Sequence, residues 1–175
     1  MQIVAIEREK AGTFEQVLML HERQVYLTAL RLLGRREDAQ DAAQEVFLRL
    51  HRHLPRLDES RLSAWLYRVT VNVRRDLLRE RKRRDGLEAT DDYADDSRDP
   101  HGEAGLAERR QLVAAALGKL PEKEPTAIVL RDIEGLSTRE VAQILGTAEV
   151  TVRSQISHAR RKMKGFIEKL LGGRL

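Results

Sequence analysis

Residues 137–164 read STREVAQILGTAEVTVRSQISHARRKMK, and this stretch decides the fold of the C-terminal part of the chain. Ser137 and Glu140 have the spacing of a capping box, in which the serine caps a backbone amide and the glutamate reaches back. Apolar residues follow at helical spacing, and Gly146 predicts a turn before a second helix that begins near Ala148. A short capped helix, a glycine turn and a basic second helix are typical of a helix-turn-helix.

The second helix of this motif has an apolar side and a polar side. In a helix-turn-helix the first helix packs across the second, and residues near the N-terminus of the second reach base edges in the major groove. An ordinary helical hairpin with a basic tail stays open as the alternative interpretation. The polar side carries Arg153, Ser154, Ser157, His158, Arg161 and Lys164.

Helical spacing of apolar residues continues upstream of this motif, which predicts an all-α protein. Glycine and proline mark the expected helix ends, because glycine terminates helices and proline cannot continue them. The expected helices span about 14–32 (closed by Gly34), 36–54 (stopped by Pro55), 60–84, a segment ending at Pro121, and 127–133 (closed by Gly135).

The third expected helix carries a row of polar residues along one edge. Arg68, Asn72, Arg75 and Arg79 stand at positions i, i+4, i+7 and i+11, so they line one side of a helix. Helix-borne arginines hold phosphates, and an asparagine reads a base edge or a flipped base. A solvated surface helix is the equally weighted alternative on this helix alone.

Charge is distributed unevenly along the 175 residues, although the net charge is only +4. Residues 72–84 hold seven basic and two acidic residues, 85–103 hold eight acidic residues and one arginine, and 151–175 hold seven basic residues and one glutamate. Two basic zones around an acidic one favour a polyanionic partner. Residues 85–106 have the glycine and aspartate content of a flexible acidic linker between two small helical domains, 1–84 and 107–175.

Several functional classes are excluded or disfavoured by composition. The chain has no cysteine, which excludes disulfides, zinc–thiolate sites and cysteine nucleophiles. The longest apolar run has six residues, far below the roughly 18 of a membrane span, so we expect a cytoplasmic protein with no direct membrane insertion. His51 and His53 lie on different sides of a helix, and no nucleophile, base and orienting group are evident. We therefore expect no catalytic residue, no metal, no cofactor and no small-molecule substrate.

Three motifs in order resemble the extracytoplasmic-function (ECF) sigma factors of bacterial RNA polymerase. Residues 38–47 (DAQDAAQEVF) resemble the family's polymerase-binding helix, and 64–72 (AWLYRVTVN) with Arg75 and Asp76 resemble its promoter −10 helix. Leu120 and Pro121, residues 130–135 (LRDIEG) and 151–154 (TVRS) resemble its region 4. The resemblance covers nearly the whole chain, with region 2 at 1–84 and region 4 at 107–175.

The resemblance implies a role for each set of residues. Contact with the polymerase β′ clamp is implied for Asp38, Asp41, Gln44 and Glu45. Contact with the −10 element is implied for Arg56, Leu57, Asp58, Arg61, Arg68, Asn72, Arg75 and Arg79. Contact with the −35 element is implied for Thr151, Arg153, Ser154, Ser157, His158 and Arg161.

The resemblance also implies a function and partners. Such a protein is not an enzyme; it directs core RNA polymerase, through the β′ and β subunits, to promoter DNA and assists −10 melting. An anti-sigma factor commonly holds it inactive, and its acidic linker enters the polymerase cleft. A stand-alone helix-turn-helix transcriptional regulator and a helical adaptor that binds only protein are the alternatives.

Overall fold

The computed structural model describes residues 2–85, 104–121 and 124–172, and all regular elements in these ranges are helical. The predicted all-α class is therefore confirmed. The predicted linker over 85–106 lies outside the described residues except at its ends. There, helix α3 reaches Asp85 and helix α4 begins at Ala104.

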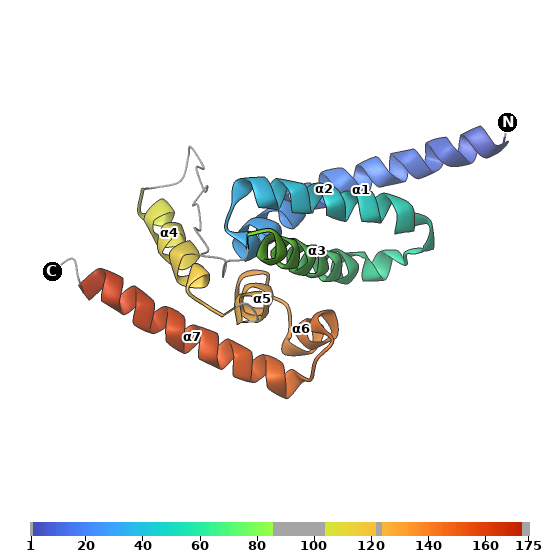
Figure 1. The fold of residues 1–175 in the computed structure, drawn as a ribbon. Helices are drawn as coiled ribbons and strands as arrows, with labels where there is room; N and C mark the ends of the chain where they lie inside the picture. The colour runs from blue at the N-terminus through green and yellow to red at the C-terminus, as the bar shows by residue number, and fades with distance from the viewer. Residues whose placement is uncertain (1, 86–103, 122–123, 173–175) are drawn as a thin grey trace.

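Helices α1 (Gln2–Leu33), α2 (Arg36–His53) and α3 (Leu62–Asp85) form the N-terminal domain (Figure 1). Gly34 adopts a φ of 75°, and its amide donates to the carbonyl of Leu30 at 2.8 Å, so α1 ends in a left-handed turn that returns the chain as α2. Burial of apolar side chains from all three helices stabilises the bundle. Its buried residues are Val25, Ala29, Leu33, Ala39, Ala42, Val46, Phe47, Leu50, Leu62, Leu66, Val69 and Val73.

Two 3₁₀ turns, η1 (Leu54–Arg56) and η2 (Glu59–Arg61), connect α2 to α3. Pro55 lies in the first turn of η1, where its missing amide hydrogen leaves no unmade bond. The predicted stop of the second helix at Pro55 is therefore close to the observed end of α2 at His53. The third helix, predicted from residue 60, begins at Leu62 because η2 occupies the preceding residues.

Helices α4 (Ala104–Gly118), α5 (Glu124–Ile128), α6 (Thr138–Leu145) and α7 (Glu149–Gly172) form the C-terminal domain. The predicted helix over 127–133 is divided, since a π-helical turn η3 (Val129–Ile133) follows α5. The core of this domain contains Leu117, Leu120, Ala127, Ile128, Val129, Leu130, Val141, Ala142, Ile144, Val152, Ile156 and Ala159.

The two domains pack directly against each other. Leu32 of α1 and Tyr67 and Val71 of α3 are buried in the same cluster as the C-terminal core, and α6 lies beside α3 (Figure 1). Arg74 is only 6% exposed; its Nε donates to the carbonyl of Leu32 at 2.9 Å, and its Nη1 donates to Thr126 Oγ1 at 3.4 Å. One arginine of the first basic zone is therefore part of the domain interface.

Within the described residues, no helix has both the length and the apolar content needed to cross a membrane.

Candidate nucleic-acid interface

The predicted helix-turn-helix is formed by α6, the turn at Gly146 and α7. Ser137 Oγ accepts from the Glu140 amide at 3.2 Å, and Glu140 Oε2 accepts from the Ser137 amide at 2.7 Å, so the predicted capping box is confirmed. These hydrogen bonds lower the pKa of Glu140 below its ordinary value. Gly146, with a φ of 63°, ends α6 in the left-handed conformation and redirects the chain into α7.

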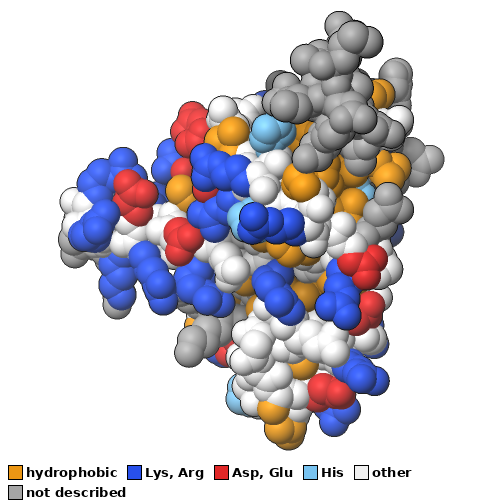
Figure 2. Space-filling model, turned by 90° about the vertical axis from the view of Figure 1, so that its right-hand side faces the viewer, with side chains coloured by type: hydrophobic (Ala, Val, Ile, Leu, Met, Phe, Trp, Pro, Cys, Tyr) orange, Lys and Arg blue, Asp and Glu red, His pale blue; other side chains and the backbone are white. Residues whose placement is uncertain are grey.

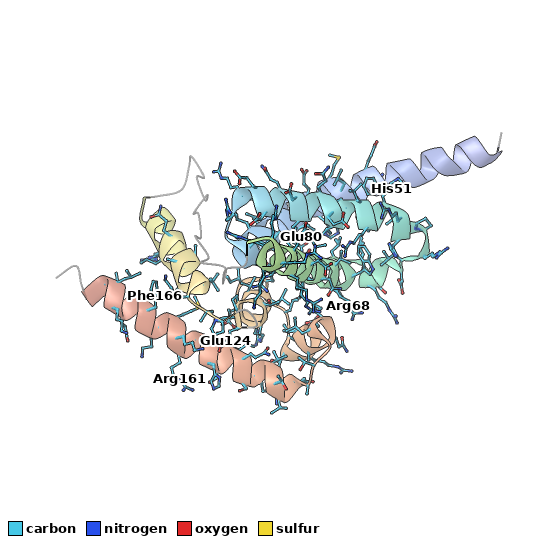
Figure 3. All side chains as sticks on the ribbon, viewed as in Figure 1. His51, Arg68, Glu80, Glu124, Arg161 and Phe166 are labelled. Atoms are coloured by element: carbon cyan, nitrogen blue, oxygen red, sulfur yellow. The ribbon has the colours of Figure 1, made fainter. Side chains whose placement is uncertain are left out.

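The outer face of α7 is open to solvent. Arg153 Nη2 donates to Glu149 Oε2 at 3.0 Å, which orients the guanidinium along the helix. Arg161 lies on the side of α7 that points away from the N-terminal domain (Figure 3). All six residues for which the resemblance implies contact with the −35 element are exposed: Thr151, Arg153, Ser154, Ser157, His158 and Arg161.

Val150 extends this outer face by one residue that the sequence analysis missed. It is 68% exposed and precedes Arg153, Ser154 and Ser157 by three, four and seven positions, so it lies on the same helical row. The signal was present in the sequence, because the same spacing rule that found the polar residues reaches Val150. An exposed aliphatic side chain on this row offers an apolar contact among polar ones.

The row on α3 is only partly open. Arg75 and Arg79 are exposed, Asn72 is half-buried, and Arg68 is exposed but engaged. Arg68 Nη2 donates to the backbone carbonyl of Gln143 in α6 at 3.1 Å, and Figure 3 shows Arg68 between the two helices. The structure thus brings the first residue of this row against the helix-turn-helix.

The η1–η2 connection lies beside the N-terminus of α3. Its residues Arg56, Asp58 and Arg61 are exposed, whereas Leu57 is half-buried against the N-terminal core. Asp58 Oδ1 accepts from the Ser60 amide at 3.0 Å, and the Asp58 carbonyl accepts from the Arg61 amide at 2.9 Å. Hydrogen bonding to Ser60 lowers the pKa of Asp58 and fixes this turn next to the row on α3.

The face of α2 that carries the predicted polymerase contacts has two side chains in ion pairs and two that are exposed to solvent. Glu45 Oε1 accepts from Arg49 Nε at 2.7 Å, and Asp38 Oδ2 lies 3.7 Å from Arg81 Nη1. Asp41 and Gln44 are exposed on the same helix. The hydrogen bond to Glu45 raises the pKa of Arg49 above its ordinary value.

Lys and Arg predominate among the charged side chains on the face that contains the α2–α3 connection, α6 and the start of α7 (Figure 2). This face therefore presents a positive field to a polyanion.

The comparisons with known proteins agree with this arrangement. Residues 17–84 match the family model of sigma-70 region 2, and residues 110–163 match that of sigma-70 region 4. The chain is 33% identical to the ECF RNA polymerase sigma factor SigM of Mycobacterium tuberculosis over 161 residues, which cover 91% of this chain and 80% of SigM. The chain belongs to the ECF sigma factors. These proteins direct RNA polymerase to promoters, and they act as initiation factors rather than as enzymes.

Further relatives and solved structures are consistent with the family. This ECF sigma factor is 34% identical to SigE of Mycolicibacterium smegmatis over 90% of its own length and 62% of the length of SigE. Its fold is similar to RpoE in a co-crystal structure with the anti-sigma factor NepR from Bartonella quintana, with a TM-score of 0.75, 25% identity and coverage of 89% and 97% of the two chains. CnrH, solved with the cytosolic domain of CnrY, gives a TM-score of 0.66 at 27% identity, with coverage of 91% and 90%.

Proposed function

We propose that the three surfaces described above divide the work of this sigma factor. The α2 face docks on core RNA polymerase, the α3 row with the η1–η2 connection binds the −10 element, and the outer face of α7 binds the −35 element. One observation supports this assignment of surfaces above all. In this member of the family, α3 and α7 each present a row of cationic and polar side chains. We propose that the factor acts in the cytoplasm together with core polymerase and performs no catalytic step of its own.

At the −35 element, α7 enters the major groove of a duplex. Arg153 is placed to pair with a guanine, because its guanidinium offers a planar set of donors to the O6 and N7 acceptors. Ser154, Ser157 and His158 lie within about one and a half turns of it and supply shorter polar contacts. Arg161 lies two turns further along the helix and contacts phosphate.

At the −10 element, the N-terminal domain holds a separated strand. Arg75 and Arg79 contact consecutive phosphates along α3, and Asn72 with the η1–η2 connection holds a base that has left the stack. The half-buried position of Asn72 between exposed arginines supports this proposal, since a base-reading amide is more selective when water is excluded. Binding to phosphates makes the affinity fall steeply with salt.

At the polymerase, the α2 face offers acidic and amide groups to a basic surface of the β′ clamp. Asp41 and Gln44 are the open members of this face, and Asp38 and Glu45 exchange their intramolecular partners for basic residues of core. The side chains of both ion pairs remain partly accessible to solvent, and such pairs contribute little to folding, about 0–1 kcal/mol, so exchanging them costs little.

A protein regulator that covers these surfaces is a further part of the proposal. Two solved relatives were captured with such partners, an anti-sigma factor in one and the cytosolic domain of CnrY in the other. We infer that an anti-sigma factor binds this chain as well.

Run-off transcription with core polymerase and fragmented genomic DNA tests the proposed function. Addition of this protein is expected to produce transcripts that core polymerase alone does not start, with a yield that falls as salt increases. Absence of any new transcript across the salt range would contradict the function. Tight binding to palindromic duplexes without polymerase would instead favour a stand-alone regulator.

A further inference from the structure

Glu134, at the end of the π-helical turn, reaches from the C-terminal domain into the N-terminal domain. Its side chain is 8% exposed. Oε1 accepts from Thr28 Oγ1 at 3.0 Å and lies 2.7 Å from Arg31 Nη1, and Oε2 accepts from the Tyr67 hydroxyl at 3.1 Å. Three donors from α1 and α3 thus converge on one carboxylate.

The chemistry of this cluster is specific for a carboxylate. A buried charge is costly unless it is paired and hydrogen-bonded, and here both oxygens of Glu134 are satisfied. Thr28 and Tyr67 are themselves buried, so their hydroxyl groups lose bulk water when the domains close and need this acceptor. Arg31 supplies the compensating charge at Oε1, where the Thr28 hydroxyl is a second donor, and the Tyr67 hydroxyl fixes the position of Oε2.

Closure through Glu134 has a consequence for the α3 row. The same packing that places Glu134 beside Tyr67 places Gln143 of α6 against Arg68, whose guanidinium donates to the Gln143 carbonyl. Arg68 is the first member of the row that we propose for the −10 element. The outer face of α7 stays exposed in this arrangement, so closure affects one DNA-binding surface and spares the other.

We infer that Thr28, Arg31 and Tyr67 form a carboxylate-binding site on the N-terminal domain, and that Glu134 occupies it to hold the two domains closed until core polymerase binds. The consequence for polymerase rests on the proposed function, whereas the site itself does not. Opening vacates the site and frees Arg68. Because part of the binding energy of core is used to open the chain, the closed form has a lower apparent affinity for core.

The substitution Glu134→Gln tests the site with little change in shape. The matched control is Asp132→Asn, two residues earlier, because Asp132 binds Arg160 at 2.7 and 2.8 Å within the C-terminal domain. Tyr67→Phe is a second variant that removes one donor and keeps the ring. Since the chain has no cysteine, spin labels can be attached to cysteines introduced at exposed Gln40 and Lys169.

Pulsed electron spin resonance between these labels reports closure. A narrow distance distribution is expected for the wild type and for Asp132→Asn, and a broader, longer one for Glu134→Gln and Tyr67→Phe. Unchanged distributions in both variants, with melting temperatures that show them folded, would overturn the inferred site. This readout does not depend on whether the protein is active with polymerase.

Affinity for core polymerase tests the consequence. Glu134→Gln is expected to bind core about threefold to tenfold more tightly than the wild type, because a larger fraction of the free chain is already open. An opened variant with unchanged affinity for core would overturn the link between closure and polymerase. Failure of the wild type itself to bind core would contradict the proposed function, and the label distances would still decide the site.

Discussion

The hydroxyl of Tyr67 on α3 donates to Glu134 at 3.1 Å, which joins two residues 67 positions apart across the domain interface. Burial, together with the nearby Glu134 carboxylate, raises the pKa of Tyr67 from 10 to about 12. The closed chain therefore retains a proton that the exposed phenol loses near pH 10.

This shift predicts that closure weakens at high pH. A group whose pKa is raised by an interaction contributes its full stabilisation below its unperturbed pKa, and loses it as the pH rises through the raised value. The contribution of Tyr67 is thus complete below about pH 10 and lost by about pH 12. Energy transfer between dyes at residues 40 and 169 measures closure from pH 8 to 12. In Tyr67→Phe the fraction of closed protein should fall less steeply with pH, because the phenol is absent while the lysines are the same in both proteins. Parallel pH profiles of the two proteins would contradict the role of the phenol.

Arg74 and Arg75 are neighbours with opposite expected roles. Arg74 is buried and donates to Leu32 and Thr126, whereas Arg75 is exposed. Arg74→Ala is expected to lower the free energy of unfolding by about 2–3 kcal/mol, because the buried carbonyl of Leu32 loses this donor and the aliphatic stem loses its packing. Urea denaturation followed by circular dichroism measures the change.

Arg75→Ala is the matched comparison for that experiment. Its free energy of unfolding should stay within about 0.5 kcal/mol of the wild type, as is usual for exposed positions. Its formation of open promoter complexes should be weaker, because a phosphate contact is lost. Equal destabilisation by the two substitutions would show that burial does not separate their roles.

The helices were predictable because their boundaries are set locally. The capping box at Ser137 and Glu140, and the glycines at 34 and 146, act through neighbouring backbone groups, so their spacing in the sequence is sufficient. The outer face of α7 was predictable for the same reason, since 3.6 residues per turn fixes which side chains share a face.

The domain interface was not predictable in this way. Thr28 and Arg31 are each more than 100 positions away from Glu134, and no local sequence pattern marks a carboxylate that accepts hydrogen bonds from three donors of another domain. Arg74 was counted in a basic zone because charge along a sequence does not reveal burial. The π-helical turn likewise has no periodic signal that distinguishes it from the α-helix expected over 127–133.

Asp41→Lys is expected to weaken binding to core polymerase about tenfold or more. The lysine on the exposed α2 face is repelled by the basic surface of the clamp. This repulsion slows association and speeds dissociation. Fluorescence anisotropy of labelled protein titrated with core measures this, at two salt concentrations. Glu15→Lys, an equal change at an exposed position of α1, should have little effect. Equal loss in both variants would assign the effect to net charge rather than to the α2 face.

Val150 is expected to select thymine at one position of the −35 element. The 5-methyl of thymine is the apolar group that the major groove offers, and Val150 is the exposed aliphatic residue in the row that contains Arg153. Duplexes selected from a random library with the wild-type protein supply the probe, and each thymine is then replaced by deoxyuridine, which lacks only the methyl.

Replacement of the thymine that Val150 contacts should weaken wild-type binding about fourfold, because burial of a methyl-sized group contributes ~0.8 kcal/mol. Val150→Ala should bind both duplexes with nearly equal affinity, because its side chain no longer reaches the methyl. Val113→Ala, a substitution at an exposed valine of α4, should keep the wild-type preference. If Val150→Ala discriminates thymine from deoxyuridine as strongly as the wild type does, another residue reads that methyl group, and the apolar contact assigned to the start of α7 is wrong.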